Sequence, residues 1–267
     1  MGTSSVFVWR YGLNFLTTLS NTTCIILFGF NSSNNRCRII QKAVQRIDQD
    51  EVCKLVSEFQ DKVLLFIHDP NGNHVIQRCI QVMSAFPQHS ADDCDADLDS
   101  ASSLTDQIQV IVDDIVANIE LLSTHRYGCR VVQRAVEHCE ASQKTAVLEH
   151  IVSCLESLIV DHYGEEGQLS YMFDCYPCSL AQLYFRIILT VSPPLGNYVV
   201  QQVFVCGDEA HKAAILDTLT RDDSLLKFSK HKYASNVVET VLMHGEPHHK
   251  ERILHEILKV SHVMHSF

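Results

Sequence analysis

The sequence lacks several features typical of secreted, membrane or catalytic proteins. Its 11 cysteines are scattered over 267 residues, far below the density of a small disulfide-linked domain, so a reducing cytoplasmic location is expected. Its unbroken apolar runs are much shorter than the roughly 18 residues of a membrane span. No phosphate-binding glycine loop or nucleophile elbow occurs in it, so neither an enzymatic activity nor a cofactor is expected.

The N-terminal residues carry no clear targeting signal. Residues 6–30 are fairly apolar, but Arg10, Asn14 and Asn21 interrupt them, and no small-residue cleavage site follows. Residues 1–35 are therefore interpreted as an irregular segment that does not belong to the fold. A membrane anchor is the alternative.

The chain also lacks the basic excess that usually accompanies nucleic-acid binding, because its formal net charge is −11. Most of this charge lies in two segments. Residues 84–107 contain six aspartates without a lysine or arginine, and residues 165–194 contain Glu165, Glu166 and Asp174 against Arg186. The rest of the chain is much closer to neutral, so a nucleic-acid partner is not excluded.

One five-residue pattern occurs five times. A small polar residue or Cys comes first, a planar or cationic side chain second, two β-branched residues third and fourth, and Gln or Glu fifth. The copies are Cys37-Arg38-Ile39-Ile40-Gln41, Asn73-His74-Val75-Ile76-Gln77, Cys129-Arg130-Val131-Val132-Gln133, Asn197-Tyr198-Val199-Val200-Gln201 and Ser235-Asn236-Val237-Val238-Glu239. Their first residues are 36, 56, 68 and 38 apart, and the two long gaps contain the two acidic segments. The underlying period, near 36, predicts a two- or three-helix unit that stacks on its neighbours.

The segments around these motifs predict helices rather than strands. Apolar residues follow helical spacing over residues 52–63 and 147–159, and no alternating pattern is present. A small residue that would permit a tight helix start directly precedes four motifs: Gly72, Gly128, Gly196 and Ala234.

Two segments interrupt the period. Residues 84–107 are expected to form a flexible acidic loop within one repeat. The irregular segment 165–195 separates a lead-in at Tyr163-Gly164 from the motif that starts at Asn197, so it could displace the first helix of that repeat. This segment and residues 1–35 are interpreted as products of an unusual splice form or gene model.

The motifs, taken with their lead-in residues, resemble the Pumilio (PUF) family of RNA-binding proteins. The resemblance rests on residues 72–80, 123–134, 196–201 and 230–239, and it covers residues 37–260 apart from the insertions. Residues 36–267 are therefore assigned to a partial Pumilio-homology domain that stops where a final repeat would start. The resemblance implies a right-handed, crescent-shaped, armadillo-like α-solenoid of about five three-helix repeats. It also implies that single-stranded RNA lies on the concave face, with one base per repeat.

Helix geometry explains which side chains would contact the RNA. Positions one and five lie four residues apart on a helix and project from the same face toward one base. The predicted base-edge contacts are Cys37, Gln41, Asn73, Gln77, Cys129, Gln133, Asn197, Gln201, Ser235 and Glu239. The second position offers a group that stacks on a base. The predicted stacking residues are Arg38, His74, Arg130, Tyr198 and Asn236.

Hydrogen-bonding capacity predicts a base for each motif. The carboxylate of Glu239 only accepts and therefore matches the two donors of guanine, whereas an amide such as Gln201 fits uracil or adenine. An Asn at position one adds a polar contact to a pyrimidine oxygen, and Cys129 offers an apolar wall to a purine. The resemblance implies the same code with antiparallel RNA. The predicted preference is therefore G-U-A-U-A, read 5′ to 3′ from the last motif to the first.

The resemblance further implies a biological role. The expected partner is messenger RNA, bound in 3′ untranslated regions, with repression of translation and of message stability. A deadenylase complex and Nanos-type co-repressors are expected partners by family analogy. Neither a membrane nor a small-molecule substrate is expected as a partner. One alternative is an α-solenoid that binds only proteins, and another is an array too incomplete to fold.

No metal site is expected. Cys175 and Cys178 form a lone C-x-x-C pair without a second pair at zinc spacing. The histidines near the C-terminus are interpreted as surface residues: His248, His249, His262 and His265.

Overall fold

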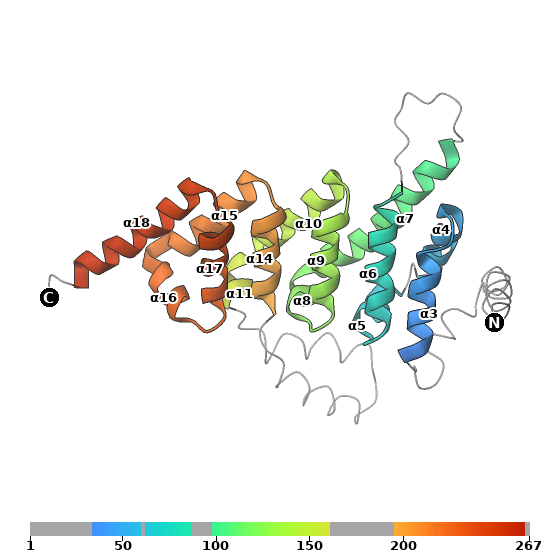
Figure 1. The fold of residues 1–267 in the computed structure, drawn as a ribbon, viewed down its shortest axis with the longest axis horizontal. Coiled ribbons are helices and arrows are strands. Elements are labelled where there is room, and N and C mark those ends of the chain that lie inside the picture. Colours follow the sequence, from blue (N-terminus) through green and yellow to red (C-terminus); the bar gives the residue numbers. More distant parts are fainter. Residues whose placement is uncertain (1–33, 60–61, 87–97, 161–194, 265–267) are drawn as a thin grey trace, which may run out of the picture. The chain divides into compact units, whose positions relative to one another are not determined.

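The described part of the chain is built from helices. The computed structural model describes residues 34–59, 62–86, 98–160 and 195–264. The contacts divide the chain into two compact units, the first ending at Ile111 and the second starting at Val112. Figure 1 labels the helices of both units.

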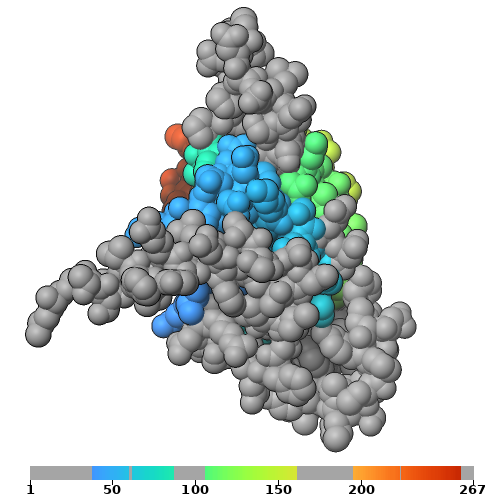
Figure 2. All heavy atoms as spheres, turned by 90° about the vertical axis from the view of Figure 1, so that its right-hand side faces the viewer, coloured from blue at the N-terminus to red at the C-terminus, as the bar shows by residue number. Residues whose placement is uncertain are grey.

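Unit 1 packs around one motif-bearing helix. Its described helices are α3 (Asn34–Val44), α4 (Gln49–Ser57), α5 (Val63–His68), α6 (Gly72–Met83) and the first part of α7 (Leu98–Ala117). Helices α3, α4 and α5 all pack against α6. The rings of Phe59 and Phe66, both fully buried, have their centroids 4.6 Å apart. Figure 2 shows the molecule from the side of α3 and α4, which are drawn in blue.

Unit 2 repeats one three-helix arrangement three times in the described residues. Each copy has a short helix, a motif-bearing helix and a third helix. The copies are α8 (Ile119–Thr124), α9 (Gly128–His138) and α10 (Ala141–Ser153); α11 (Leu155–Val160), α14 (Gly196–Cys206) and α15 (Glu209–Thr220); and α16 (Ser224–Lys230), α17 (Ala234–His244) and α18 (Pro247–Met264). The 3₁₀ turn η2 (Arg221–Asp223) leads into α16. Helix α14 packs against both α9 and α17, so the motif-bearing helices lie side by side (Figure 1).

Non-helical residues separate one repeat from the next. Lys62 precedes α5 with φ −136° and ψ 7°, Asn118 precedes α8 with −125° and 25°, and Cys154 precedes α11 with −120° and 22°. The helical apolar spacing over residues 52–63 and over 147–159 is thus divided between two helices in each case. Because each break is short, the apolar spacing continues across it, and periodicity alone does not reveal it.

Two helices that follow a motif helix, α4 and α15, begin with side-chain caps. The Asp48 carboxylate accepts a hydrogen bond from Glu51 N at 3.0 Å, and the Asp208 carboxylate accepts one from His211 N at 3.1 Å. These bonds satisfy backbone donors that have no partner inside the helix. They fix the point at which the chain turns from the motif helix into the third helix.

Close backbone approach explains the glycines before the motifs. A Cβ added at Gly72, Gly128 or Gly196 would lie 2.6–2.7 Å from the carbonyl oxygen of Phe66, Leu122 or Leu158, respectively. The same contact in all three repeats shows that α11 holds the usual first-helix position against α14. The insertion between α11 and α14 therefore does not displace the first helix of that repeat.

The predicted acidic loop over residues 84–107 is wrong in its second part. Helix α6 ends at Met83, but α7 already begins at Leu98. The later turns of α7 bury Ile108, Ile111 and Ile115. Once those turns are anchored, extending the helix toward its N-terminus fixes only one more residue per added hydrogen bond. Residues 87–97 of the predicted loop lie outside the described residues.

The other two predicted irregular segments lie almost entirely outside the described residues, which exclude 1–33 and 161–194. At their edges, Asn34 is already the first residue of α3, and Leu195 is the N-cap of α14. None of the helices that the structure describes combines the length and apolar character needed to cross a membrane.

Candidate nucleic-acid interface

Each of the five motifs lies within a helix, α3, α6, α9, α14 or α17, and the last four motifs begin at the second residue of their helix. The two β-branched residues at positions three and four are buried in the last four of these helices. Helix α3 differs, since Ile40 is buried but the Ile39 side chain is 67% exposed. The apolar pairs therefore anchor four motif helices, and this orientation leaves positions two and five on the opposite face.

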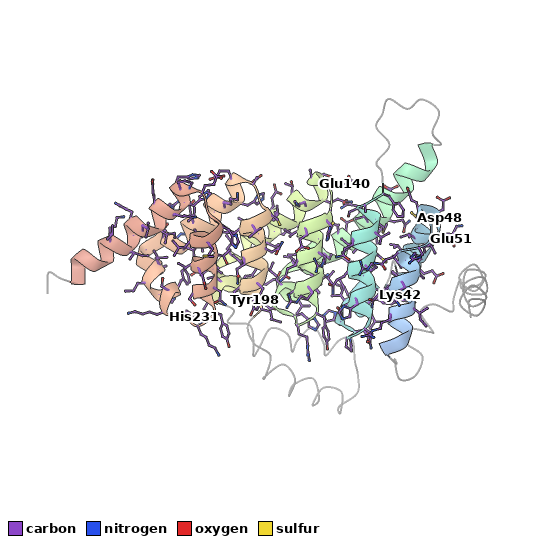
Figure 3. The ribbon with its side chains drawn as sticks, viewed as in Figure 1. Lys42, Asp48, Glu51, Glu140, Tyr198 and His231 are labelled. Atoms are coloured by element: carbon purple, nitrogen blue, oxygen red, sulfur yellow. The ribbon has the colours of Figure 1, made fainter. Side chains whose placement is uncertain are left out.

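Second-position side chains lie at the surface. Arg38, His74, Arg130 and Tyr198 are exposed, and Asn236 is half-buried. The Tyr198 ring is 43% exposed and lies at the same edge of unit 2 as His231 (Figure 3). An exposed ring or planar cation on a fixed helix can stack on a base without first being uncovered.

The first-position side chains that the structure describes are buried or half-buried. Asn73 and Cys129 are each 1% exposed, Asn197 is fully buried, and Ser235 is half-buried. The side chain of Cys37 lies outside the described residues. The sequence predicts that these side chains contact a base edge; in α6 and α14 the buried Asn also bonds to the side chain at position five.

The two Asn–Gln motifs share one hydrogen-bonding arrangement. Gln77 Nε2 donates to Asn73 Oδ1 at 2.9 Å, and Gln201 Nε2 donates to Asn197 Oδ1 at the same distance. Asn73 Nδ2 in turn donates to the Asp69 carbonyl at 2.8 Å. The buried Asn therefore holds the nitrogen end of the Gln amide, leaving its second N–H and its carbonyl oxygen for other partners.

The Cys and Ser motifs are arranged differently. Arg130 Nη1 donates to Gln133 Oε1 at 3.4 Å, so here the predicted stacking residue touches the predicted base reader. Ser235 Oγ donates to the Lys232 carbonyl at 3.4 Å, and the Glu239 carboxylate is exposed. An exposed carboxylate with acceptor capacity only is suited to a partner with two adjacent donors.

A side chain before each of three motif helices holds the turn that starts the helix, and sequence reasoning assigned it no role. Asp69 Oδ1 accepts from Gly72 N at 2.6 Å. His125 Nδ1 accepts from Gly128 N at 3.1 Å, and His231 Nδ1 accepts from Ala234 N at 3.2 Å. The signal was present as an Asp or His three residues before each small residue.

Exposed cations stand beside two of these turns. The Arg126 guanidinium lies 4.8 Å from the centroid of the Tyr127 ring, and Lys232 Nζ lies 5.0 Å from that of the Tyr233 ring. Such contacts favour a defined position for an otherwise flexible charge. They place positive charge near the start of α9 and α17 in a chain that is acidic as a whole.

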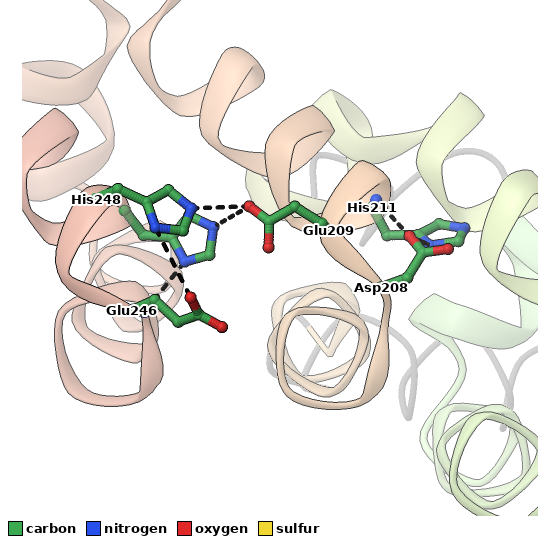
Figure 4. Close-up of polar contacts among 6 residues, drawn as sticks. Asp208, Glu209, His211, Glu246 and His248 are labelled. Carbon is green, nitrogen blue, oxygen red and sulfur yellow. Dashed lines mark hydrogen bonds and ion pairs between the residues drawn. The ribbon is translucent and has the colours of Figure 1, made fainter.

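One group in the described residues has the spacing of metal ligands: Glu209, His248 and His249 (Figure 4). Glu246 N donates to His249 Nδ1 at 3.1 Å, so the proton of this neutral ring is on Nε2, which donates to Glu209 Oε1 at 2.7 Å. A metal would need the lone pair of that same Nε2. The residues therefore do not fit a metal ion; they form a hydrogen-bonded link between α15 and α18.

The prediction that His249 is a surface residue is wrong. Its side chain is 1% exposed and its ring lies 5.7 Å from that of Phe204. The adjacent His248 is exposed, as predicted. Hydrogen bonds from both imidazoles lower the pKa of the Glu209 carboxyl. Cys175, Cys178 and His265 lie outside the described residues, as does the side chain of His262.

Comparison with known proteins identifies the family to which this chain belongs. The family model described as the Pumilio-family RNA binding repeat matches residues 37–59, 62–85, 118–152, 194–220 and 224–258, which is more than half of the chain. The chain is thus an α-solenoid built from repeats, and each motif helix has exposed or half-buried side chains at its second and fifth positions. It belongs to the Pumilio family, as the sequence predicted.

Individual relatives agree with this assignment. A Pumilio domain-containing protein of Schizosaccharomyces pombe is 26% identical over 240 residues, 90% of this chain and 27% of that protein. Fem-3 mRNA-binding factor 2 of Caenorhabditis elegans is 24% identical over 237 residues, 87% of this chain and 30% of that protein. The chain therefore spans only about a third or less of such relatives.

Solved structures confirm the predicted all-α solenoid. PUF-8 in complex with PBE-RNA has a TM-score of 0.66 and 26% identity, over 92% of this chain and 56% of the other. The Puf3 RNA binding domain bound to a Cox17 RNA 3′ UTR site has a TM-score of 0.59 and 28% identity, over 87% of this chain and 52% of the other.

Proposed function

We propose that this chain binds single-stranded RNA and recognises one base at each motif helix. The observation that carries the proposal is the shared register of α9, α14 and α17, in which a surface second position accompanies a fifth position that retains free donors or acceptors. Stacking on the second position would supply about 1 to 3 kcal/mol per base. PUF-8 and Puf3, with which the chain shares its fold, are described as bound to RNA.

The proposed base order is G at α17, U at α14 and A at α9, followed by U at α6 and A at α3. Glu239 accepts the two guanine donors, while the amides of Gln201 and Gln77 pair with uracil and that of Gln133 pairs with adenine. The buried Asn at position one holds the amide of Gln77 and that of Gln201, whereas Arg130 contacts the amide of Gln133. In this proposal, the side chain at position five makes the main base-edge contact, and the side chain at position one lies beneath it.

The proposed cellular role is post-transcriptional repression of messages that carry this sequence in 3′ untranslated regions. The chain would act in the cytoplasm by holding messenger RNA, and a deadenylase complex with Nanos-type co-repressors would supply the repression by family analogy. A scaffold that binds only proteins is the alternative function. Such a scaffold would gain nothing from amide and carboxylate side chains kept at one helical register.

The test is a binding assay with five-base RNAs that differ at one position. The double variant Ser235→Asn, Glu239→Gln should change the preference at the 5′ base from G to U. Glu251→Gln, which removes one exposed carboxylate from α18, is the matched control for net charge and should leave the preference at G. If the double variant still prefers G, the assigned register is wrong.

A further inference from the structure

Thr240 links the last repeat to the base reader of the repeat before it. It follows Glu239 in α17 and is 9% exposed. Its Oγ1 lies 3.1 Å from Gln201 Oε1 on α14, although the two residues are 39 positions apart, and 2.8 Å from the Asn236 carbonyl. Both of these oxygens can only accept, and the hydroxyl has one proton, so it shares that proton between the Asn236 carbonyl, which is nearer, and Gln201 Oε1.

The amide of Gln201 is consequently held at both ends. Its nitrogen donates to Asn197 Oδ1 within α14, and its oxygen accepts from Thr240 in α17. The groups left for a base are one N–H and one lone pair on Oε1, in a fixed order. Because uracil and adenine present donor and acceptor in different order, an amide that is fixed discriminates between them better than one that can turn over.

The corresponding position in the other motifs is occupied by a longer side chain: Lys42, Arg78, Arg134 and Gln202. Arg134 pairs with Glu137, and Gln202 Nε2 donates to Cys206 Sγ at 3.1 Å, both within their own helix. Thr240 is shorter and buried, and its hydroxyl reaches the neighbouring amide. Its bond to Gln201 thus joins the residue that directly follows one motif to the fifth position of the motif in another repeat.

We infer that Thr240 is a positioning residue that sets the base preference at α14 by orienting the Gln201 amide. The inference rests on the proposed function, since it assigns a specificity role to a residue that would not contact RNA. A single neutral hydrogen bond changes an equilibrium constant, such as a Kd, by a factor of about 3 to 10. Removing it is expected to weaken the preference for U over A at the second base by that factor and to leave the first base unaffected.

The binding test uses the full chain with three variants. Thr240→Val keeps the shape and removes the hydroxyl, Thr240→Ser restores the hydroxyl, and Thr218→Val removes a hydroxyl in α15 that donates to the Ala214 carbonyl at 2.9 Å. The ratio of Kd values for G-A-A-U-A and G-U-A-U-A should fall for Thr240→Val and return for Thr240→Ser. It should not change for Thr218→Val. An unchanged ratio in Thr240→Val would overturn the inference.

A second measurement needs no RNA. The side-chain amide of Gln201, assigned by its loss in Gln201→Leu, should give a pair of NMR signals that shift in Thr240→Val and stay in place in Thr218→Val. Unmoved signals in Thr240→Val would overturn the inference even if RNA binding is specific. Shifted signals in a protein that does not distinguish bases would instead refute the proposed function, and with it the specificity role of Thr240.

Discussion

The two compact units differ in how their base readers are supported. In unit 2, side chains from neighbouring repeats meet: Thr240 binds Gln201, His249 binds Glu209, and Ser157 Oγ donates to Glu120 Oε1 at 3.0 Å between α11 and α8. In unit 1, the amide of Gln77 is held by Asn73 of its own helix. Repetition of complete three-helix copies therefore creates contacts that one motif helix cannot make alone, and these contacts extend to the proposed RNA face.

The first motif helix, α3, differs from the other motif helices in the burial of its apolar pair. The third-position side chain of α3, Ile39, is 67% exposed, whereas the corresponding Val75, Val131, Val199 and Val237 are fully buried. Burial of such a side chain contributes about 1.5 to 3 kcal/mol. Helix α3 is therefore anchored less firmly than the helices of unit 2, and its motif should contribute less to RNA binding.

The largest expected effect concerns buried thiols, one in each unit. Burial raises the pKa of Cys79 in α6 and of Cys139 after α9 to about 12 from a usual 9.0. The thiolate fraction near neutral pH is then about a thousandfold lower than for an ordinary cysteine. Alkylation by iodoacetamide, followed by peptide mass spectrometry, should therefore modify both residues only after the structure opens.

The same experiment compares the units directly. If local opening limits the reaction, Cys79 should be modified before Cys139 as denaturant is added, because unit 2 has the additional links between repeats. Simultaneous modification would mean that the two units open together. The half-buried Cys206 serves as a reference thiol within unit 2.

The next effect tests the tight approach of the short helix to the motif helix. Gly128→Val in unit 2 and Gly72→Val in unit 1 should each lower the free energy of unfolding by about 3 kcal/mol, because the backbone carbonyls that they meet cannot move aside like a side chain. Thermal denaturation followed by circular dichroism measures this loss. Ala234→Gly, which only removes a Cβ at the corresponding place, is the control and should cost about 1 kcal/mol or less.

Stacking provides a third comparison between the units. Tyr198→Ala is expected to weaken binding of G-U-A-U-A by about 2 kcal/mol, whereas Arg38→Ala should cost less, because α3 is anchored less firmly. Fluorescence anisotropy with labelled RNA gives both Kd values. Tyr198→Phe retains the ring and should bind like the natural chain. Equal losses at the two positions would show that the exposure of Ile39 has no consequence for the site.

The smallest effect is a difference in pH dependence. Burial lowers the pKa of His68 in α5 below its usual 6.5, against a weaker opposing effect of its bond to the Leu64 carbonyl. Below pH 6.5 the unfolded chain takes up a proton that the folded chain resists, so unit 1 loses stability as the pH falls from 6.5 toward the folded value. His68→Gln should reduce this loss, measured by hydrogen exchange of α5 peptides at pH 7.5 and 5.5.

Unit 2 should respond at lower pH. Hydrogen bonds lower the pKa of Asp208, chiefly from His211 N, and that of Glu209, chiefly from His248. The stability that these carboxylates provide is present above their usual values near 4 and is lost as the pH falls through the lowered values. The protection of α15 peptides, after correction for the intrinsic pH dependence of exchange, should therefore remain constant between pH 7.5 and 5.5, unlike that of α5 peptides. Loss of protection in both would mean that His68 is not the cause.

Much of the fold followed from local patterns. The five motifs were placed on helices because their β-branched pairs require one buried face, and the structure buries that pair fully in α6, α9 and α14. The extra length of α7 was missed, since the composition of residues 98–107 resembles a loop and only the buried isoleucines that follow extend the helix. Exposure of Tyr198 and burial of Val199 followed from helical geometry alone.

The sequence by itself determined the repeat length, the helical class, the family and the chemical identity of each fifth-position side chain, because these depend on spacing and residue type within one helix. Only the tertiary structure decided that Asn73 and Asn197 are buried, that His249 is a core residue, and that Thr240 reaches Gln201. The physical reason is distance along the chain. Contacts such as that of Thr240 join residues 39 positions apart, and they exist only once the repeats have stacked and fixed which faces of neighbouring helices meet.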